Sequence, residues 1–173
     1  QGERISDRGD VMNGPVRFID LQKQYQNLRS EIQECLDRVM SSGSFILRQD
    51  VEDFETQMAD WLGVEAVIGV NSGTDALFLS MRALGIGHGD EVITVAHTIV
   101  ATVETIVHCG AKPVFVDIDP DTWNMDSAQL ERAVTDRTKA IIPVGIYGQT
   151  ADMDAINEIA FVIGLKPNDD IAI

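Results

Sequence analysis

The chain has 173 residues, of which 45% are hydrophobic, and a formal net charge of −15 at pH 7. That length is enough to bury one sizeable core, and the acidic balance argues against nucleic acid or an anionic membrane as a partner. The sequence has no apolar run of about 18 residues and no basic-then-apolar leader, so we expect a cytoplasmic protein.

Residues 1–14 are polar, and we expect a mobile tail there. Residues 15–62 form the predicted N-terminal helical segment. Apolar residues recur at helical spacing over 23–40 and again over 51–62. Cys35 and Cys109 each fall on an apolar helical stretch without C-x-x-C spacing. They are therefore expected to be buried thiols, and neither a disulfide nor a metal site is expected.

Residues 63–160 alternate between strand and helix patterns. Strands are predicted at 66–70, 91–95, 112–117 and 138–144, and helices at 74–84, 100–108, 127–134 and 153–160. Short, continuous apolar strands separated by helices indicate a mainly parallel sheet with helices on both faces, a three-layer α/β/α domain. Ligands of such sheets bind at the carboxyl ends of the strands. The loops expected there are 71–75, 96–98, 117–122 and 145–149.

The segment Asn71-Ser72-Gly73-Thr74 interrupts an apolar run just before a predicted helix. Backbone N–H groups and two hydroxyls would then converge at the positive end of the helix dipole, where a phosphate fits. Gly73 lacks a Cβ, so a ligand can approach the backbone closely. The alternative is an ordinary helix start in which Ser72 or Thr74 is the N-cap.

A series of motifs follows in order between residues 15 and 166. They are VNSGTDAL at 70–77, ALGIGHGDEVI at 83–93, GAKPVFVDIDP at 110–120, TKAIIPV at 138–144 and YGQ at 147–149. Together they resemble the DegT/StrS family of pyridoxal-phosphate-dependent sugar aminotransferases. The resemblance implies part of a large domain of the aspartate aminotransferase (type I) fold, with pyridoxal 5′-phosphate as cofactor.

By this resemblance, Ser72, Gly73 and Thr74 bind the cofactor phosphate. The family places an aromatic side chain against the pyridine ring directly after a threonine, and this chain has Ile99 there. Ile99 could still pack on the ring, or His97 could supply a flat π-face instead. The alternative for His97 is a hydrogen bond to the loop backbone.

Gln149 lies in the active-site loop that the resemblance implies, where Gly145 replaces a histidine often found in the family. Asp170 matches the carboxylate that binds the protonated pyridine nitrogen, a charge pair that keeps the ring an electron sink. Pro167-Asn168 replace the apolar pair expected before it, so Asp170 could instead be an exposed tail carboxylate. Residues 161–173 are accordingly expected to form an atypical C-terminal tail.

None of the four lysines, Lys23, Lys112, Lys139 and Lys166, occupies a position that the family uses for its imine-forming lysine. No catalytic residue is therefore assigned, and we expect a truncated front part of a large domain that is inactive by itself. The complete protein would transfer an amino group, with glutamate as donor, to a keto-sugar nucleotide and would be a homodimer or larger. Alternatives are a non-catalytic binding or assembly module and a degenerate gene product.

Overall fold

The structure is a computed structural model, and it describes residues 18–43 and 45–165. The chain divides into two compact units at residues 53 and 54. The first unit contains α1 (Leu21–Ser42), which begins where Asp20 Oδ1 accepts a hydrogen bond from the Lys23 amide at 3.0 Å. No residue of α1 is buried, and Cys35 is exposed. The prediction of a buried Cys35 is therefore wrong, because an amphipathic helix buries its apolar face only against a second packed element.

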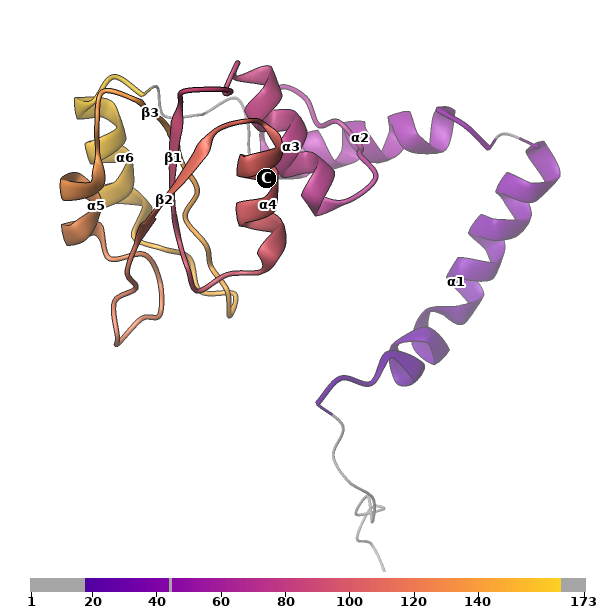
Figure 1. The fold of residues 1–173 in the computed structure, drawn as a ribbon. Coiled ribbons are helices and arrows are strands. Elements are labelled where there is room, and N and C mark those ends of the chain that lie inside the picture. The colour runs from indigo at the N-terminus through magenta and orange to yellow at the C-terminus, as the bar shows by residue number, and fades with distance from the viewer. Residues whose placement is uncertain (1–17, 44, 166–173) are drawn as a thin grey trace, which may run out of the picture. The chain divides into compact units, whose positions relative to one another are not determined.

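The second helix, α2 (Gln49–Leu62), continues into the second unit, which contains a parallel sheet. The strands are β1 (Glu91–Val95), β2 (Lys112–Val116) and β3 (Thr138–Ile141), in the order β2-β1-β3. The helices beside them are α3 (Gly73–Ala83), α4 (Val100–His108), α5 (Ser127–Ala133) and α6 (Met153–Val162). Figure 1 shows α3 and α4 on one face of the sheet and α5 and α6 on the other. The predicted three-layer α/β/α architecture is confirmed.

The central strand β1 is buried along its whole length, and its side chains belong to two hydrophobic cores. Ile93 packs toward α5 and α6, in a cluster with Leu130. Val92, its neighbour in sequence, packs toward α3 and α4 with Ile106. Successive side chains of a strand point to opposite faces, so a strand covered on both sides has apolar residues facing both cores. Cys109 belongs to the second core and is buried, as predicted.

Residues 66–70 do not form the strand that their apolar sequence predicts. The side chains of Ile68 and Val70 are 79% and 42% exposed, and the Gly69 amide donates to Glu55 Oε1 at 2.6 Å. A strand exists only as part of a hydrogen-bonded ladder, and none of the described strands runs beside this segment. The prediction of a strand here is wrong for that reason.

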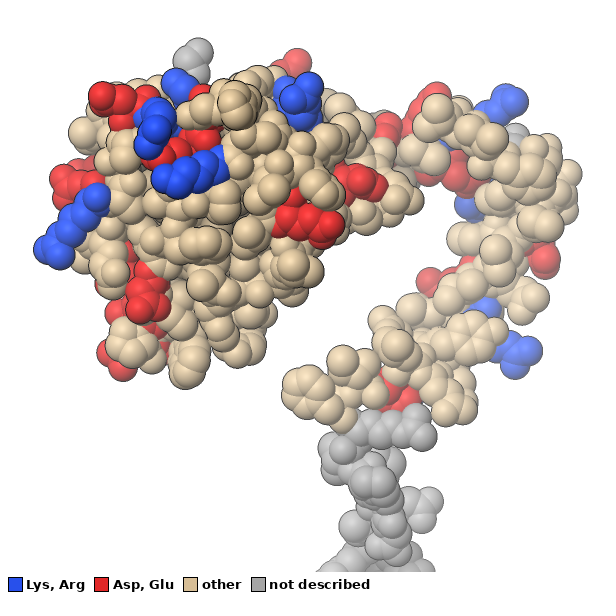
Figure 2. Space-filling view, in the orientation of Figure 1, with Lys and Arg blue, Asp and Glu red and all other residues tan. Residues whose placement is uncertain are grey.

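One buried carboxylate connects the starts of all three strands. Glu91 opens β1 with only 2% of its side chain exposed. It accepts hydrogen bonds from Lys112 Nζ at 3.1 Å, Arg137 Nη2 at 2.7 Å and Thr135 Oγ1 at 2.6 Å. The Thr135 hydroxyl and the Lys112 ammonium hold the pKa of Glu91 below its usual value, although burial opposes them. Figure 2 shows basic and acidic side chains grouped on the upper side of this unit, where β1 and β2 begin in Figure 1.

Candidate functional site

The turn before α3 is held by hydrogen bonds among its own side chains. Ser72 is the N-cap, with extended backbone (φ −161°, ψ 164°), and its Oγ accepts from the Asp75 amide at 3.1 Å. The Asp75 carboxylate in turn accepts from Asn71 Nδ2 at 2.8 Å and from Ser72 Oγ at 3.2 Å. Of the two N-cap candidates in the alternative interpretation, Ser72 is the cap, and the carboxylate of Asp75 is already matched with two donors.

The next two amides, those of Gly73 and Thr74, open α3 and point out of its first turn. Such amides have no acceptor inside a helix, and no described group accepts from these two. A Cβ built on Gly73 would meet nothing within 4 Å, and both residues are exposed. Open space, free N–H groups and the positive end of the helix dipole together suit a phosphate.

The N-terminus of α3 points toward the edge of the sheet where the strands end. Residues 84–90 connect the end of α3 to the start of β1, and Ile86 in this connection shares a core with Val92 of β1. Helix α3 and strand β1 are of similar length, about 17 Å. Because α3 ends near the start of β1 and is about as long as β1, its first residues lie near the end of β1.

His97, in the loop after β1, lies close to two other aromatic side chains. Its ring centroid is 5.7 Å from that of Trp123 and 5.8 Å from that of Tyr147, at interplanar angles of 46° and 58°. Its Nε2 atom is buried and has no hydrogen-bond partner among the described residues. The structure thus places His97 and the loop of Tyr147 together, and it shows no bond from Nε2 to the loop backbone.

Ile99 does not join this cluster. It precedes α4 as an N-cap without a side-chain hydrogen bond, and it is 66% exposed. The aromatic ring near the end of β1 that could pack against a pyridine ring is therefore that of His97, two residues before Ile99.

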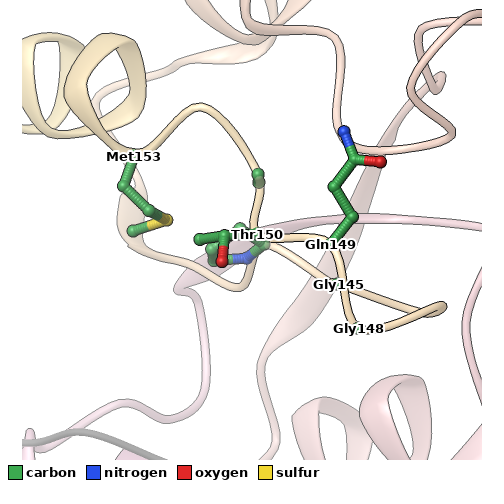
Figure 3. A pocket seen from close by; sticks show the side chains of 7 residues that line it. Gly145, Gly148, Gln149, Thr150 and Met153 are labelled. Carbon is green, nitrogen blue, oxygen red and sulfur yellow. The ribbon is translucent and has the colours of Figure 1, made fainter.

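The loop after β3 forms a shallow pocket that contains Gln149. Its lining residues are Pro143, Gly145, Gly148, Gln149, Thr150, Ala151 and Met153. The side chain of Gln149 extends away from those of Thr150 and Met153 (Figure 3). The Gly148 amide donates to the Gly145 carbonyl at 3.0 Å, and a Cβ on Gly145 would come within 2.7 Å of the Gln149 carbonyl oxygen. This tight turn therefore leaves no room for a side chain at position 145.

Trp123 was not predicted as a site residue. It has a left-handed backbone (φ +63°), and its amide donates to the Asp119 carbonyl at 2.8 Å. Asp119 Oδ1 accepts from the amides of Thr122 and Asp121, and these bonds lower the pKa of Asp119. The turn-forming sequence from Asp119 to Thr122 is visible as a motif, but nothing in it shows that the indole of Trp123 turns toward His97.

A family model described as the DegT/DnrJ/EryC1/StrS aminotransferase family matches residues 26–172. The chain belongs to this family. It is 49% identical over 157 residues to the UDP-2-acetamido-2-deoxy-3-oxo-D-glucuronate aminotransferase of Pseudomonas aeruginosa. The matched residues are 91% of this chain and 44% of that protein. Among solved structures it resembles S. venezuelae DesV in complex with a ketimine intermediate, with a TM-score of 0.84, 43% identity, and coverage of 87% of this chain and 40% of that one.

A second solved structure, ntda from Bacillus subtilis with bound cofactor PMP, has a TM-score of 0.83 and is 36% identical, over 87% of this chain and 35% of that one. Aminotransferases of the DegT family depend on pyridoxal phosphate. The chain spans less than half the length of these relatives. The free amides of Gly73 and Thr74, the open space above Gly73 and the unpartnered Nε2 of His97 fit a phosphate and an aromatic ring.

The remaining predicted positions of the DegT pattern are distributed as follows. Asp170 and Lys166 lie outside the described residues. Lys112 and Lys139 belong to the first residues of β2 and β3, at the edge of the sheet opposite to His97, and Lys23 belongs to α1. In the described ranges no group of three or more His, Cys, Asp or Glu could hold a metal ion, and none of the helices there is long and apolar enough to cross a membrane.

Proposed function

We propose that this chain is part of a pyridoxal-phosphate-dependent aminotransferase that transfers an amino group, with glutamate as donor, to the keto group of a nucleotide-linked sugar. The family match and the similarity to the Pseudomonas aminotransferase support the reaction type. The observation that carries the proposal is the pair of acceptor-free amides at Gly73 and Thr74, under open space at the N-terminus of α3.

In this proposal Gly73 and Thr74 bind the cofactor phosphate through their amides, and the Thr74 hydroxyl adds a third donor. Ser72 keeps the turn in place as N-cap, while its hydroxyl donates to the Asp75 carboxylate. His97 covers one face of the pyridine ring, with Ile99 at its border. Gln149 supplies an amide at the mouth of the site, and Asp170 binds the pyridine nitrogen. Bound pyridoxal phosphate supplies an electron sink for the bond broken at the amino-acid Cα.

The proton at Cα needs a base, and the family uses a lysine for it. Lys112 and Lys139 lie at the opposite edge of the sheet, and Lys112 is paired with Glu91. We therefore assign activity to the protein that contains both this chain and the further length found in its relatives. The 173 residues alone bind the cofactor reversibly, without turnover.

We further propose that the protein is a homodimer, because family active sites are completed by two subunits. The apolar side chains of Phe161, Val162 and Ile68 are 73%, 77% and 79% exposed. Exposed apolar side chains of this size are typical of a surface that a second protein surface covers, which supports the proposal. Light scattering at tens of micromolar should give at least twice the mass of one chain. A strictly monomeric mass would contradict this part of the proposal.

The phosphate site is tested by equilibrium dialysis of pyridoxamine 5′-phosphate, which has no aldehyde and does not form imines with surface lysines. We expect saturable, reversible binding that excess inorganic phosphate reduces. Gly73→Val should abolish it, because the new side chain enters the open space above the first turn. Unchanged binding by a Gly73→Val chain with native circular dichroism would show that the phosphate lies elsewhere.

A further inference from the structure

Three loops that each follow a strand meet at the imidazole of His97. His97 itself comes from the loop after β1, Trp123 from the loop after β2, and Tyr147 from the loop after β3. Both ring pairs are tilted, and their centroid distances lie within the range of favourable aromatic contacts. The His97 ring thus lies close to two aromatic rings from residues that are distant in sequence.

The backbone at Trp123 is in a conformation that a bulky residue rarely adopts. Such conformations persist only where the surroundings over-determine them, and they concentrate at functional sites. Here the Asp119 carbonyl accepts from the Trp123 amide, and the Asp119 amide donates to the Asn124 carbonyl at 2.9 Å. These bonds hold the backbone of the turn from which the half-exposed indole extends.

Asn124 also joins the loop of Trp123 to the loop of Tyr147. It is 5% exposed, and its Nδ2 donates to the Thr150 carbonyl at 3.2 Å. The two rings that flank His97 therefore form parts of one connected support. Nε2 of His97 is withdrawn from water and has no hydrogen-bond partner within residues 18–43 and 45–165.

We propose that Trp123 is a positioning residue, which fixes the His97 ring plane so that His97 can stack on the pyridine ring of the cofactor. This inference rests on the proposed function. It explains why this chain needs no aromatic residue at position 99, where the exposed Ile99 stands. Trp123 acts through His97 and makes no direct contribution to the chemistry.

The first experiment uses Trp123 as its own reporter. The chain has two tryptophans, and the other, Trp61, is 79% exposed on α2. In a Trp61→Phe chain, pyridoxamine 5′-phosphate should quench the emission of Trp123 in a saturable manner, because energy passes from the indole to a nearby pyridine. Unchanged Trp123 emission at concentrations where calorimetry shows saturation would overturn the proposal without any change at position 123.

The second experiment measures affinity by calorimetry in the Trp61→Phe background. Trp123→Leu should weaken binding of pyridoxamine 5′-phosphate up to about tenfold, the limit set by one aromatic pair. Trp123→Phe, which keeps a ring, should restore the affinity to within about threefold. In a chain that already carries His97→Leu, Trp123→Leu should cause no further loss, because the residue through which it acts is gone.

The outcomes distinguish a failure of the proposed positioning role of Trp123 from a failure of the proposed function. Binding that is equally tight with Trp123 and with Leu overturns the positioning role and leaves the proposed function intact. A loss that is undiminished in the His97→Leu chain also overturns it, since Trp123 would then act independently of His97. Absence of binding in every variant, including the Trp61→Phe parent, overturns both proposals.

Discussion

Glu91 and Arg137 form an ion pair of 2.7 Å in which the carboxylate is buried and the guanidinium is exposed: their side chains are 2% and 64% accessible. A carboxylate withdrawn from water in this way depends on its donors. Because the donors are Lys112 at the start of β2 and Thr135 and Arg137 just before β3, the pair also aligns the strands at the edge opposite to the candidate site.

We expect Glu91→Gln to lower the melting temperature at pH 7, since the amide offers one acceptor and no charge. The folded-state pKa of Glu91 is lowered, so its contribution to stability is fully present above the unfolded value of about 4.3. That contribution is lost as the pH falls through the folded pKa. The difference in melting temperature between parent and variant should therefore shrink at acid pH.

The matched control is Glu104→Gln, since Glu104 is 49% exposed and 3.9 Å from His108. It should change the melting temperature little at any pH. A Glu91→Gln difference that stays constant between pH 7 and pH 3 would contradict the proposed charge pairing.

Variants of the two N-cap residues Ser72 and Asp152 distinguish an effect on stability from an effect on cofactor binding. Each accepts from the amide three residues later at 3.1 Å, so Ser72→Ala and Asp152→Ala should each lower the free energy of unfolding by about 1 kcal/mol in urea titrations. Only Ser72→Ala should also weaken the binding of pyridoxamine 5′-phosphate. Equal affinities of the two variants would assign Ser72 a purely structural role.

Gly145 is predicted to be irreplaceable in the present turn. Gly145→Ala places a Cβ within 2.7 Å of the Gln149 carbonyl oxygen and should lower the free energy of unfolding by about 1–3 kcal/mol. The comparison is Gly87→Ala, whose Cβ would meet the Cys109 carbonyl oxygen at an ordinary 3.7 Å and should change stability by less than about 1 kcal/mol. Similar denaturation curves for the two variants would show that the turn at Gly145 opens without penalty.

The 173-residue chain alone is predicted to lack aminotransferase activity. The lysines of its sheet lie at the edge away from His97, where they cannot reach a ligand of the carboxyl-edge loops. The check is a glutamate-dependent assay with a keto-sugar nucleotide, against free pyridoxal phosphate as background. Turnover above that background would mean that a lysine of this chain, such as Lys166, has the role of base.

Much of the second unit follows from local patterns. The predicted bounds of β1 and α4 match the structure, because apolar continuity and helical spacing act over neighbouring residues. Residues 66–70 carry the same apolar signal but no ladder, since strand formation depends on a neighbour that sequence spacing does not reveal. Cys35 shows the same limit for a helix, where an apolar face alone does not supply a covering element.

At the candidate site, the sequence indicated Ser72, Gly73 and Thr74 because a turn and a helix start are local features. The meeting of His97 and Tyr147 could be anticipated only in outline, since both follow strands of one parallel sheet. Trp123 was missed, because its left-handed backbone depends on hydrogen bonds to Asp119 that composition does not reveal.

The most direct test of the account is a nitrogen-resolved NMR titration of the chain with pyridoxamine 5′-phosphate, with the amides of Gly73 and Thr74 as reporters. A phosphate bound at the start of α3 should shift both resonances saturably, and inorganic phosphate should shift the same two. The amides of Ala128 and Ala155, which are already bonded to the caps of α5 and α6, should not move. Saturable binding that leaves Gly73 and Thr74 unmoved, or no binding at all, would contradict the assignment of the cofactor site.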